Sequence, residues 1–296
     1  MRNKYWFVAL LLCCTALLAA AFVGIFQKAE KDSAGDEISV VTSFYPVYIA
    51  AVNVAEGCGG ITVTNLSEPQ TGCLHDFQLT PEDMKLLSDA DLFLVNGGGM
   101  ESFLTETAEE FPSLPIVRTA EGVTLSEENA HVWMSVGRYR KMVHVILEEL
   151  LQISPEFAEQ LRENAAAYDA KLAKLQEQQD KIAAAADGRT VVSFHDAFAY
   201  LADDYGFTAG YTINLDEERQ IGAGEVADVL SAVQKQKIRI LFAEELYGKE
   251  LAETIQKETD VSVYYLDPLV RGPYEPDSYI EGMQKNIDLL KAAFGV

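Results

Sequence analysis

Basic residues are scarce in this chain of 296 residues. It contains 23 Lys and Arg against 46 Asp and Glu, which gives a formal net charge of −23 at pH 7. Such an acidic surface repels a phosphate backbone, which argues against a nucleic-acid partner. The sequence also lacks a P-loop, a glycine-rich nucleotide-binding signature and low-complexity runs. We therefore expect no nucleotide hydrolysis by this chain itself.

Cysteine is rare as well, and two of the four cysteines lie in an unusual N-terminal segment. Cys13 and Cys14 fall within the uncharged apolar run 5–26, which follows Arg2 and Lys4. A basic start before an apolar run is typical of an export signal, and this run is also long enough to span a bilayer. No small residue directly precedes the cysteines, so we do not expect lipidation.

The N-terminal pattern fixes the expected compartment of the rest of the chain. We predict that residues 1–37 are a signal or membrane anchor followed by a tether, with the remainder outside the cytoplasm. In that oxidising compartment Cys58 and Cys73 can form a disulfide. It would close a loop of about 15 residues and stabilise the fold by on the order of 3 kcal/mol. Two free thiols are the alternative.

Apolar, β-branched runs alternate with helical patterns in both halves of the chain, which predicts parallel sheets with crossover helices. The predicted strands are residues 38–43, 61–65, 91–96 and a start at 116–117, then 190–194, 238–243 and 261–266.

One stretch between these two groups, residues 154–188, reads as a single uninterrupted helix of about 48 Å. Ser154 and Pro155 suit its first turn and Gly188 its end. We interpret it as a rigid strut that joins two lobes. The alternatives are a helix on the surface of one domain and a coiled-coil arm. We predict an α/β fold with two lobes, each a parallel sheet flanked by helices, joined by one long rigid backbone helix. The predicted lobes are residues 38–153 and 189–296.

The chain has only four histidines, and three of them lie in loops or at strand ends. His75 and His131 precede the predicted strut and His195 follows it, while Asp267 ends the last predicted strand. The ends of strands in parallel sheets are where such folds bind ligands. His144 differs because it lies in mid-helix between two valines, and we expect it to be structural.

Three imidazoles and one carboxylate form a closed, roughly tetrahedral site suited to Zn²⁺. Added carboxylates shift the preference towards Mn²⁺, so three histidines favour zinc. Histidine must be deprotonated to bind a metal, and affinity should therefore fall below about pH 6.

At these residues the chain resembles the zinc- and manganese-binding solute-binding proteins of ABC transporters, from about residue 38 to the C-terminus. The matching blocks are LHDFQLTPED with His75, AHVWMSV with His131, SFHDAFAYLADDYGF with His195, and YYLDPL with Asp267. The resemblance implies that these four residues bind the metal between two lobes. It also implies delivery of the ion to a permease with a cytoplasmic ATPase, and no enzymatic activity.

The resemblance assigns neighbouring residues as well. Glu244 in LFAEEL matches a glutamate common in the second lobe of the family, and we expect it to contact a ligand or to stabilise the lobe, with direct ligation as the alternative. Asp76 and Asp196 are expected to be solvated or to contact a ligand. The Cys58–Cys73 pair is not general in the family and would stiffen the loop that presents His75.

One further departure and three alternatives remain. The segment 121–130 lacks the histidine-rich acidic loop of many zinc-type members, although His195 is of the zinc type, since manganese-type members often have glutamate at this position. Manganese or iron binding by a protein of the same type is therefore the first alternative. A secreted zinc hydrolase is the second, although no His-Glu-x-x-His helix occurs. Binding of an iron chelate or haem is the third. For an adhesive role the sequence gives no signal.

Overall fold

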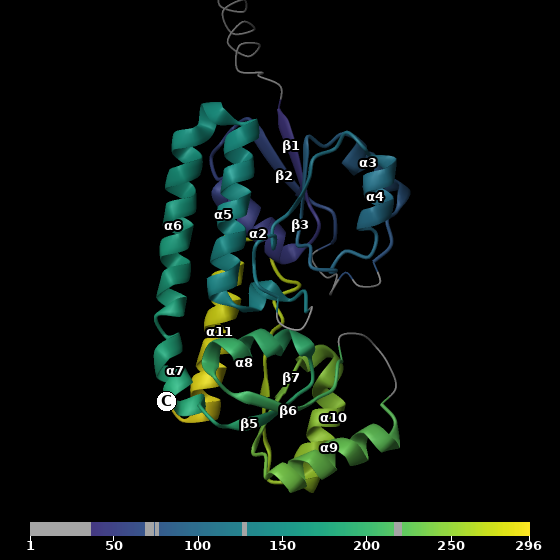
Figure 1. The fold of residues 1–296 in the computed structure, drawn as a ribbon, viewed down its shortest axis with the longest axis vertical. Helices are drawn as coiled ribbons and strands as arrows, with labels where there is room; N and C mark the ends of the chain where they lie inside the picture. Colours follow the sequence, from purple (N-terminus) through teal and green to yellow (C-terminus); the bar gives the residue numbers. More distant parts are fainter. Residues whose placement is uncertain (1–36, 69–73, 75–76, 126–128, 216–220) are drawn as a thin grey trace, which may run out of the picture.

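Two parallel four-stranded sheets, one above the other in Figure 1, form the two halves of the molecule. The computed structural model describes residues 37–68, 74, 77–125, 129–215 and 221–296. We call the half around the first sheet the N-terminal lobe and the half around the second sheet the C-terminal lobe. Helices flank both sheets, which confirms the predicted two-lobed α/β fold class.

The N-terminal lobe is built around a sheet with the strand order β2-β1-β3-β4. All three pairings are parallel, and Val40 of β1 is aligned with Val63 on one side and Leu92 on the other. β3 is completely buried, as expected of an apolar strand covered on both faces. The elements are β1 (Ile38–Thr42), α2 (Tyr45–Val54), β2 (Ile61–Asn65), α3 (Pro81–Ser88), β3 (Leu92–Val95), α4 (Leu104–Glu110) and β4 (Ile116–Arg118).

The C-terminal lobe repeats this plan with the order β6-β5-β7-β8. Its sheet contains one strand that the sequence analysis did not predict. That strand, β6, has the sequence TAGYT and is only partly buried, so it lacks a continuous apolar run. The elements are β5 (Thr190–Ser193), η3 (Asp196–Phe198), α8 (Ala199–Tyr205), β6 (Thr208–Thr212), α9 (Ala223–Gln236), β7 (Ile240–Ala243), α10 (Glu245–Glu258) and β8 (Ser262–Tyr265).

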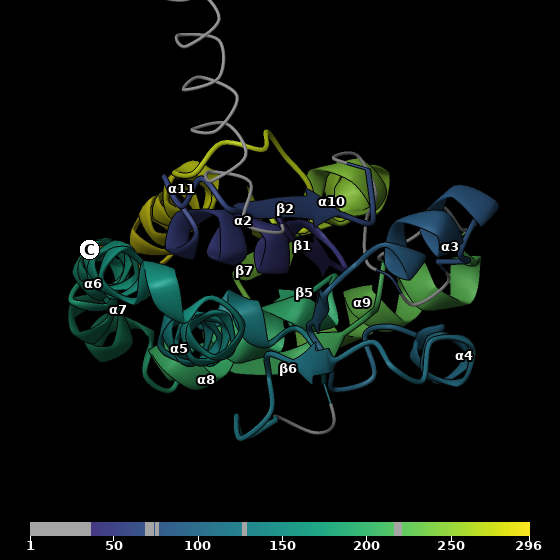
Figure 2. The ribbon, with the colours of Figure 1, turned by 90° about the horizontal axis from the view of Figure 1, so that it is seen from above.

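A column of helices stands beside both sheets and connects the lobes (Figures 1 and 2). α6 packs against α5 and α2 of the N-terminal lobe, while α7 packs against α8 of the C-terminal lobe and α11 contacts both α6 and α7. The apolar residues that recur at helical spacing along α6 are buried: Leu161, Ala165, Tyr168, Leu172 and Leu175. The elements are η1 (Val132–Met134), α5 (Val136–Ile153), η2 (Pro155–Phe157), α6 (Ala158–Gln176), α7 (Gln179–Ala186) and α11 (Ser278–Phe294).

The column corrects one prediction, because residues 154–188 do not form an uninterrupted helix. A short 3₁₀ turn precedes α6, and two residues separate the end of α6 from the start of α7. At this break the Gln178 N–H donates to the Leu175 carbonyl, three residues back, which tightens the turn. The Gln178 side chain also accepts a hydrogen bond from Lys291 of α11 at 2.6 Å. Contacts with α11 therefore accompany a break that helical periodicity alone does not reveal.

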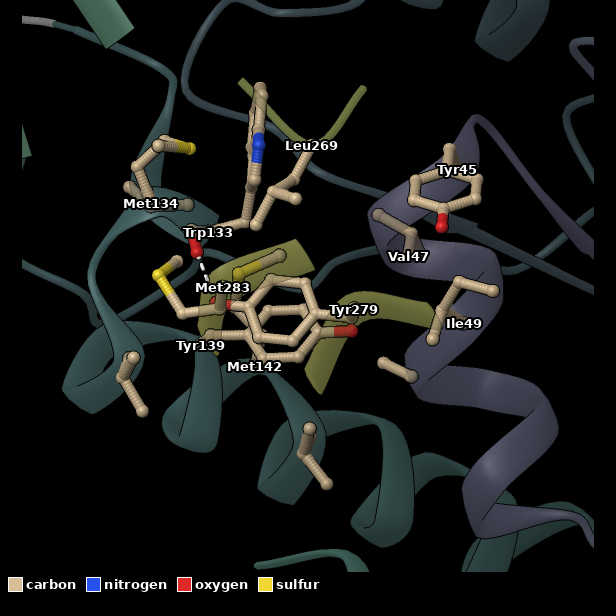
Figure 3. Packing of buried hydrophobic residues seen from close by; sticks show 14 of the residues in the cluster. Tyr45, Val47, Ile49, Trp133, Met134, Tyr139, Met142, Leu269, Tyr279 and Met283 are labelled. Atoms are coloured by element: carbon tan, nitrogen blue, oxygen red, sulfur yellow. Dashed lines mark hydrogen bonds between the residues drawn. The ribbon is translucent and has the colours of Figure 1, made fainter. Parts of the chain in front are cut away.

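The segment 268–277, between β8 and α11, crosses to the N-terminal lobe. Trp133 Nε1 donates to the Pro268 carbonyl at 2.8 Å, and the Tyr274 hydroxyl donates to the Ser67 carbonyl at 2.6 Å. Figure 3 shows Trp133 beside Leu269 and the hydrogen bond from the Tyr279 hydroxyl to the Trp133 carbonyl. These contacts connect the lobes on the side of the sheets where the loops that carry His131 and His195 lie.

Several predicted features fall outside the described residues: the apolar run 5–26, Cys73, and His75 with Asp76. Within the described ranges, no helix combines the length and the apolar character needed to cross a bilayer. Cys58 is a buried free thiol in the structure, and burial raises its pKa. The Cys58–Cys73 disulfide therefore stays a prediction.

The helical column yields a test of packing. Leu172 on α6 is fully buried in the core, so we expect Leu172→Ala to lower the free energy of unfolding by about 2–5 kcal/mol. Glu163→Ala changes an exposed residue of the same helix and should shift it by less than about 0.5 kcal/mol. Urea denaturation measures both, and equal midpoints would contradict the buried position of Leu172.

Candidate metal centre

His131 approaches the boundary between the lobes from the N-terminal lobe. It directly precedes η1, and its side chain is 1% exposed. Asn129 Oδ1 lies 2.9 Å from the His131 backbone nitrogen and 2.8 Å from its Nδ1. The ring also contacts Trp133, with centroids 5.1 Å apart. A loop residue is thus held in one orientation by its neighbours in the sequence.

His195 approaches from the C-terminal lobe, two residues beyond the end of β5. Its side chain is also 1% exposed, and its Nδ1 lies 3.3 Å from Glu244 Oε2. That contact does not have hydrogen-bond geometry, and neither ring nitrogen has a hydrogen-bond partner among the described residues. Buried polar atoms are normally hydrogen-bonded, so the two ring nitrogens of His195 are available to bind a cation.

The two histidines meet. Their ring centroids are 5.2 Å apart and the rings are nearly perpendicular, at 80°. Asp196 Oδ1 lies 3.6 Å from His131 Nδ1 and 3.7 Å from His195 Nε2. One ligand atom from each of these three residues falls within 4.8 Å of the others, a spacing that could hold a metal ion.

Charge around His195 is balanced by an ion pair. Glu244 is only 5% exposed, and its Oε1 accepts a hydrogen bond from Arg271 Nη2 at 3.2 Å. The Arg271 guanidinium in turn lies 5.4 Å from the centre of the Tyr247 ring. Glu244 therefore faces His195 with one oxygen and a cation with the other. Whether Glu244 orients His195 stays a prediction.

Asp267 lies two residues beyond the end of β8 and does not belong to the three-residue group. Its backbone is held by the buried side chain of Asn286, which accepts from the Asp267 N–H at 2.9 Å and donates to its carbonyl at 2.7 Å. Its Oδ1 accepts a hydrogen bond from the Leu269 N–H at 2.8 Å. Asp267 is exposed to solvent as a residue, yet the protein atoms around its carboxylate partly desolvate it and raise its pKa.

The two remaining histidines are His75, a predicted ligand, and His144, which was expected to be structural. His75 lies outside the described residues, but Phe77, two residues later, packs against Phe103 with ring centroids 5.5 Å apart. His144 lies on the outer face of α5, where its side chain is 70% exposed and 4.0 Å from Glu148. It takes no part in the group formed by His131 and His195.

Asn129 was not among the predicted site residues, and Asp196 was predicted only to be solvated or to contact a ligand. Asn129 Nδ2 donates to the Asp196 carbonyl at 2.8 Å, so these two residues connect the histidine loops across 67 positions of sequence. The available signal was weak: an asparagine two residues before one histidine and an aspartate directly after another. Such residues are common in loops, and only the folded chain brings them together.

Two buried imidazoles beside carboxylates are suited to a borderline divalent cation rather than to a hard one. Because the donors come from both lobes, an ion bound here would also hold the lobes together.

Residues 40–293 match the family described as ZnuA, zinc-uptake complex component A periplasmic. The high-affinity zinc uptake system protein ZnuA of Bacillus subtilis (strain 168) is 26% identical over 97% of both chains. The iron-binding protein YfeA of Yersinia pestis is 29% identical over 100% of this chain and 98% of its own length.

Among solved structures, the Zn(II)-bound ZnuA-like domain of Streptococcus pneumoniae AdcA has a TM-score of 0.76 at 28% identity. The alignment covers 88% of this chain and all of that domain. The family match spans both lobes and includes every predicted ligand. The chain belongs to the ZnuA family of zinc-uptake complex component A periplasmic proteins.

Proposed function

We propose that this protein is an extracytoplasmic solute-binding protein that captures a divalent metal ion, most readily Zn²⁺, between its lobes and delivers it to an ABC permease. The observation that carries this proposal is the meeting of two buried imidazoles from opposite lobes, His131 and His195, at a centroid distance of 5.2 Å. Zinc- and iron-binding relatives support the same function. Residues 5–26 would hold the exported chain at the membrane.

The proposed ligands are His75, His131, His195 and Asp267. The rings of His131 and His195 lie together. Because β5, β7 and β8 are parallel, Asp267 follows β8 at the same edge of the C-terminal sheet at which His195 follows β5. Asp196 lies beside both imidazoles and adds negative charge, which attracts a cation. We assign it a supporting role, because its neighbour His195 already supplies the ligand from that turn.

Zinc is favoured over manganese because imidazole nitrogen predominates in the proposed ligand set. Glu244 supports this choice, since it faces His195 and is itself neutralised in part by Arg271. Elemental analysis of protein purified without added metal, followed by competition between Zn²⁺ and Mn²⁺, tests the assignment. We expect Mn²⁺ to be displaced by equimolar Zn²⁺. Retention of Mn²⁺ would reverse the assignment of the metal.

The first prediction for the site concerns the contribution of His131 and His195 to zinc affinity. His131→Ala and His195→Ala should each weaken zinc binding by more than about 100-fold, beyond the effect usual for a residue that only supports a ligand. His144→Ala is the matched control, because His144 is exposed on α5, and it should bind zinc like the wild type. Calorimetric or chelator-competition titrations measure all three. Similar losses in all variants would rule out a specific site.

The second prediction compares the contributions of the Asp267 and Asp196 carboxylates to zinc affinity. Asp267→Asn should cost more than about 100-fold in zinc affinity, whereas Asp196→Asn should cost about 10-fold or less because Asp196 supports the ligands. Both substitutions preserve side-chain volume, so packing is little disturbed. The reverse order of effects in the same titration would make Asp196, and not Asp267, the carboxylate ligand.

A further inference from the structure

The hydrogen bonds around Asn129 determine which ring nitrogen of His131, a proposed ligand, carries the proton. A backbone N–H only donates, so the side-chain atom of Asn129 that faces the His131 N–H must be the amide oxygen. An amide oxygen only accepts, so the His131 Nδ1 that lies 2.8 Å from it must carry the ring proton. In that tautomer the lone pair is on Nε2, the nitrogen that a cation would then bind.

The opposite end of the same amide reaches the other lobe. Asn129 Nδ2 donates to the Asp196 carbonyl at 2.8 Å, one residue beyond His195. The carbonyl accepts only, which agrees with the orientation of the amide deduced above. The Tyr200 hydroxyl of α8 also donates to the Asn129 carbonyl. The backbone and the side chain of Asn129 are therefore both bonded to the C-terminal lobe.

The residue between Asn129 and His131 is held from the N-terminal lobe. Asn96 Nδ2, just beyond β3, donates to the Ala130 carbonyl at 2.9 Å. The short segment 129–131 is thus bonded on one side to the N-terminal sheet and on the other to the turn that carries His195.

We infer that Asn129 is a positioning residue: its amide oxygen holds His131 in the tautomer that presents Nε2, and its amide nitrogen fixes the distance between the His131 and His195 loops. This role rests on the proposed function, because it prepares both imidazoles for one ion. Groups that hold a ligating histidine by its second nitrogen raise its basicity and commonly govern metal affinity.

Two substitutions separate the two ends of the amide. Asn129→Asp keeps an acceptor for His131 but replaces the donor to the Asp196 carbonyl with a carboxylate oxygen. Asn129→Ala removes both. Asn164 of α6 offers a matched control, since its Nδ2 also donates to backbone carbonyls, those of Val54 and Glu56 in the N-terminal lobe.

The experiment measures zinc affinity by chelator competition and the His131 tautomer by ¹⁵N NMR of the metal-free full-length protein. We expect Asn129→Ala to weaken zinc binding by about 10–100-fold and to lose the pure Nδ1–H tautomer. Asn129→Asp should keep the tautomer and bind zinc at least about tenfold more tightly than Asn129→Ala. Asn164→Ala should match the wild type in both measurements.

Three results would overturn the role of Asn129: unchanged zinc affinity in Asn129→Ala, an unchanged tautomer in that variant, or an equal loss in Asn164→Ala. If Asn129→Ala does not fold, the nearly isosteric Asn129→Asp still decides, because loss of the Nδ1–H tautomer there contradicts the inference. Failure of the wild type to bind zinc would refute the proposed function, whereas a wild-type His131 without the Nδ1–H tautomer would refute only the positioning role.

Discussion

The structure depends on one contact, the meeting of the His131 and His195 imidazoles where the two lobes face each other. Both side chains are almost fully buried, and the nitrogens of His195 have no hydrogen-bond partner among the described residues. Each buried nitrogen without a hydrogen-bond partner costs about 1–3 kcal/mol of folding free energy. Binding of a ligand would explain why the fold retains this cost. A cation between the rings would remove that cost and would connect the lobes.

The rest of the molecule limits how far those rings can separate. The helical column runs beside both sheets, and the segment 268–277 crosses between the lobes with hydrogen bonds from Trp133 and Tyr274. Asn53 of α2 adds another to the Pro276 carbonyl. A wide hinge movement would break all of these bonds together. Capture by small tilts of the lobes and movement of the ligand loops fits the connections better.

Much of this architecture could be predicted from the sequence, because buried parallel strands leave a strong local signal. The run that became β1 was predicted almost to the residue, whereas β6 was missed because TAGYT is neither continuous nor strongly apolar. The break before α7 also escaped prediction, since the contacts of Gln178 with α11 that accompany it are distant in sequence. His131 and His195 stood out by their rarity and position, but the link through Asn129 exists only after folding. The contributions of His75 and Asp267 remain predictions.

The central claim is that histidines from both lobes bind one ion, and zinc K-edge X-ray absorption tests it most directly. For protein loaded with one equivalent of Zn²⁺, we predict four nitrogen or oxygen neighbours at about 2.0–2.2 Å. Outer-shell scattering from more than one imidazole should accompany them. A six-coordinate oxygen shell without imidazole scattering would contradict the account, because it would place the ion away from His131 and His195.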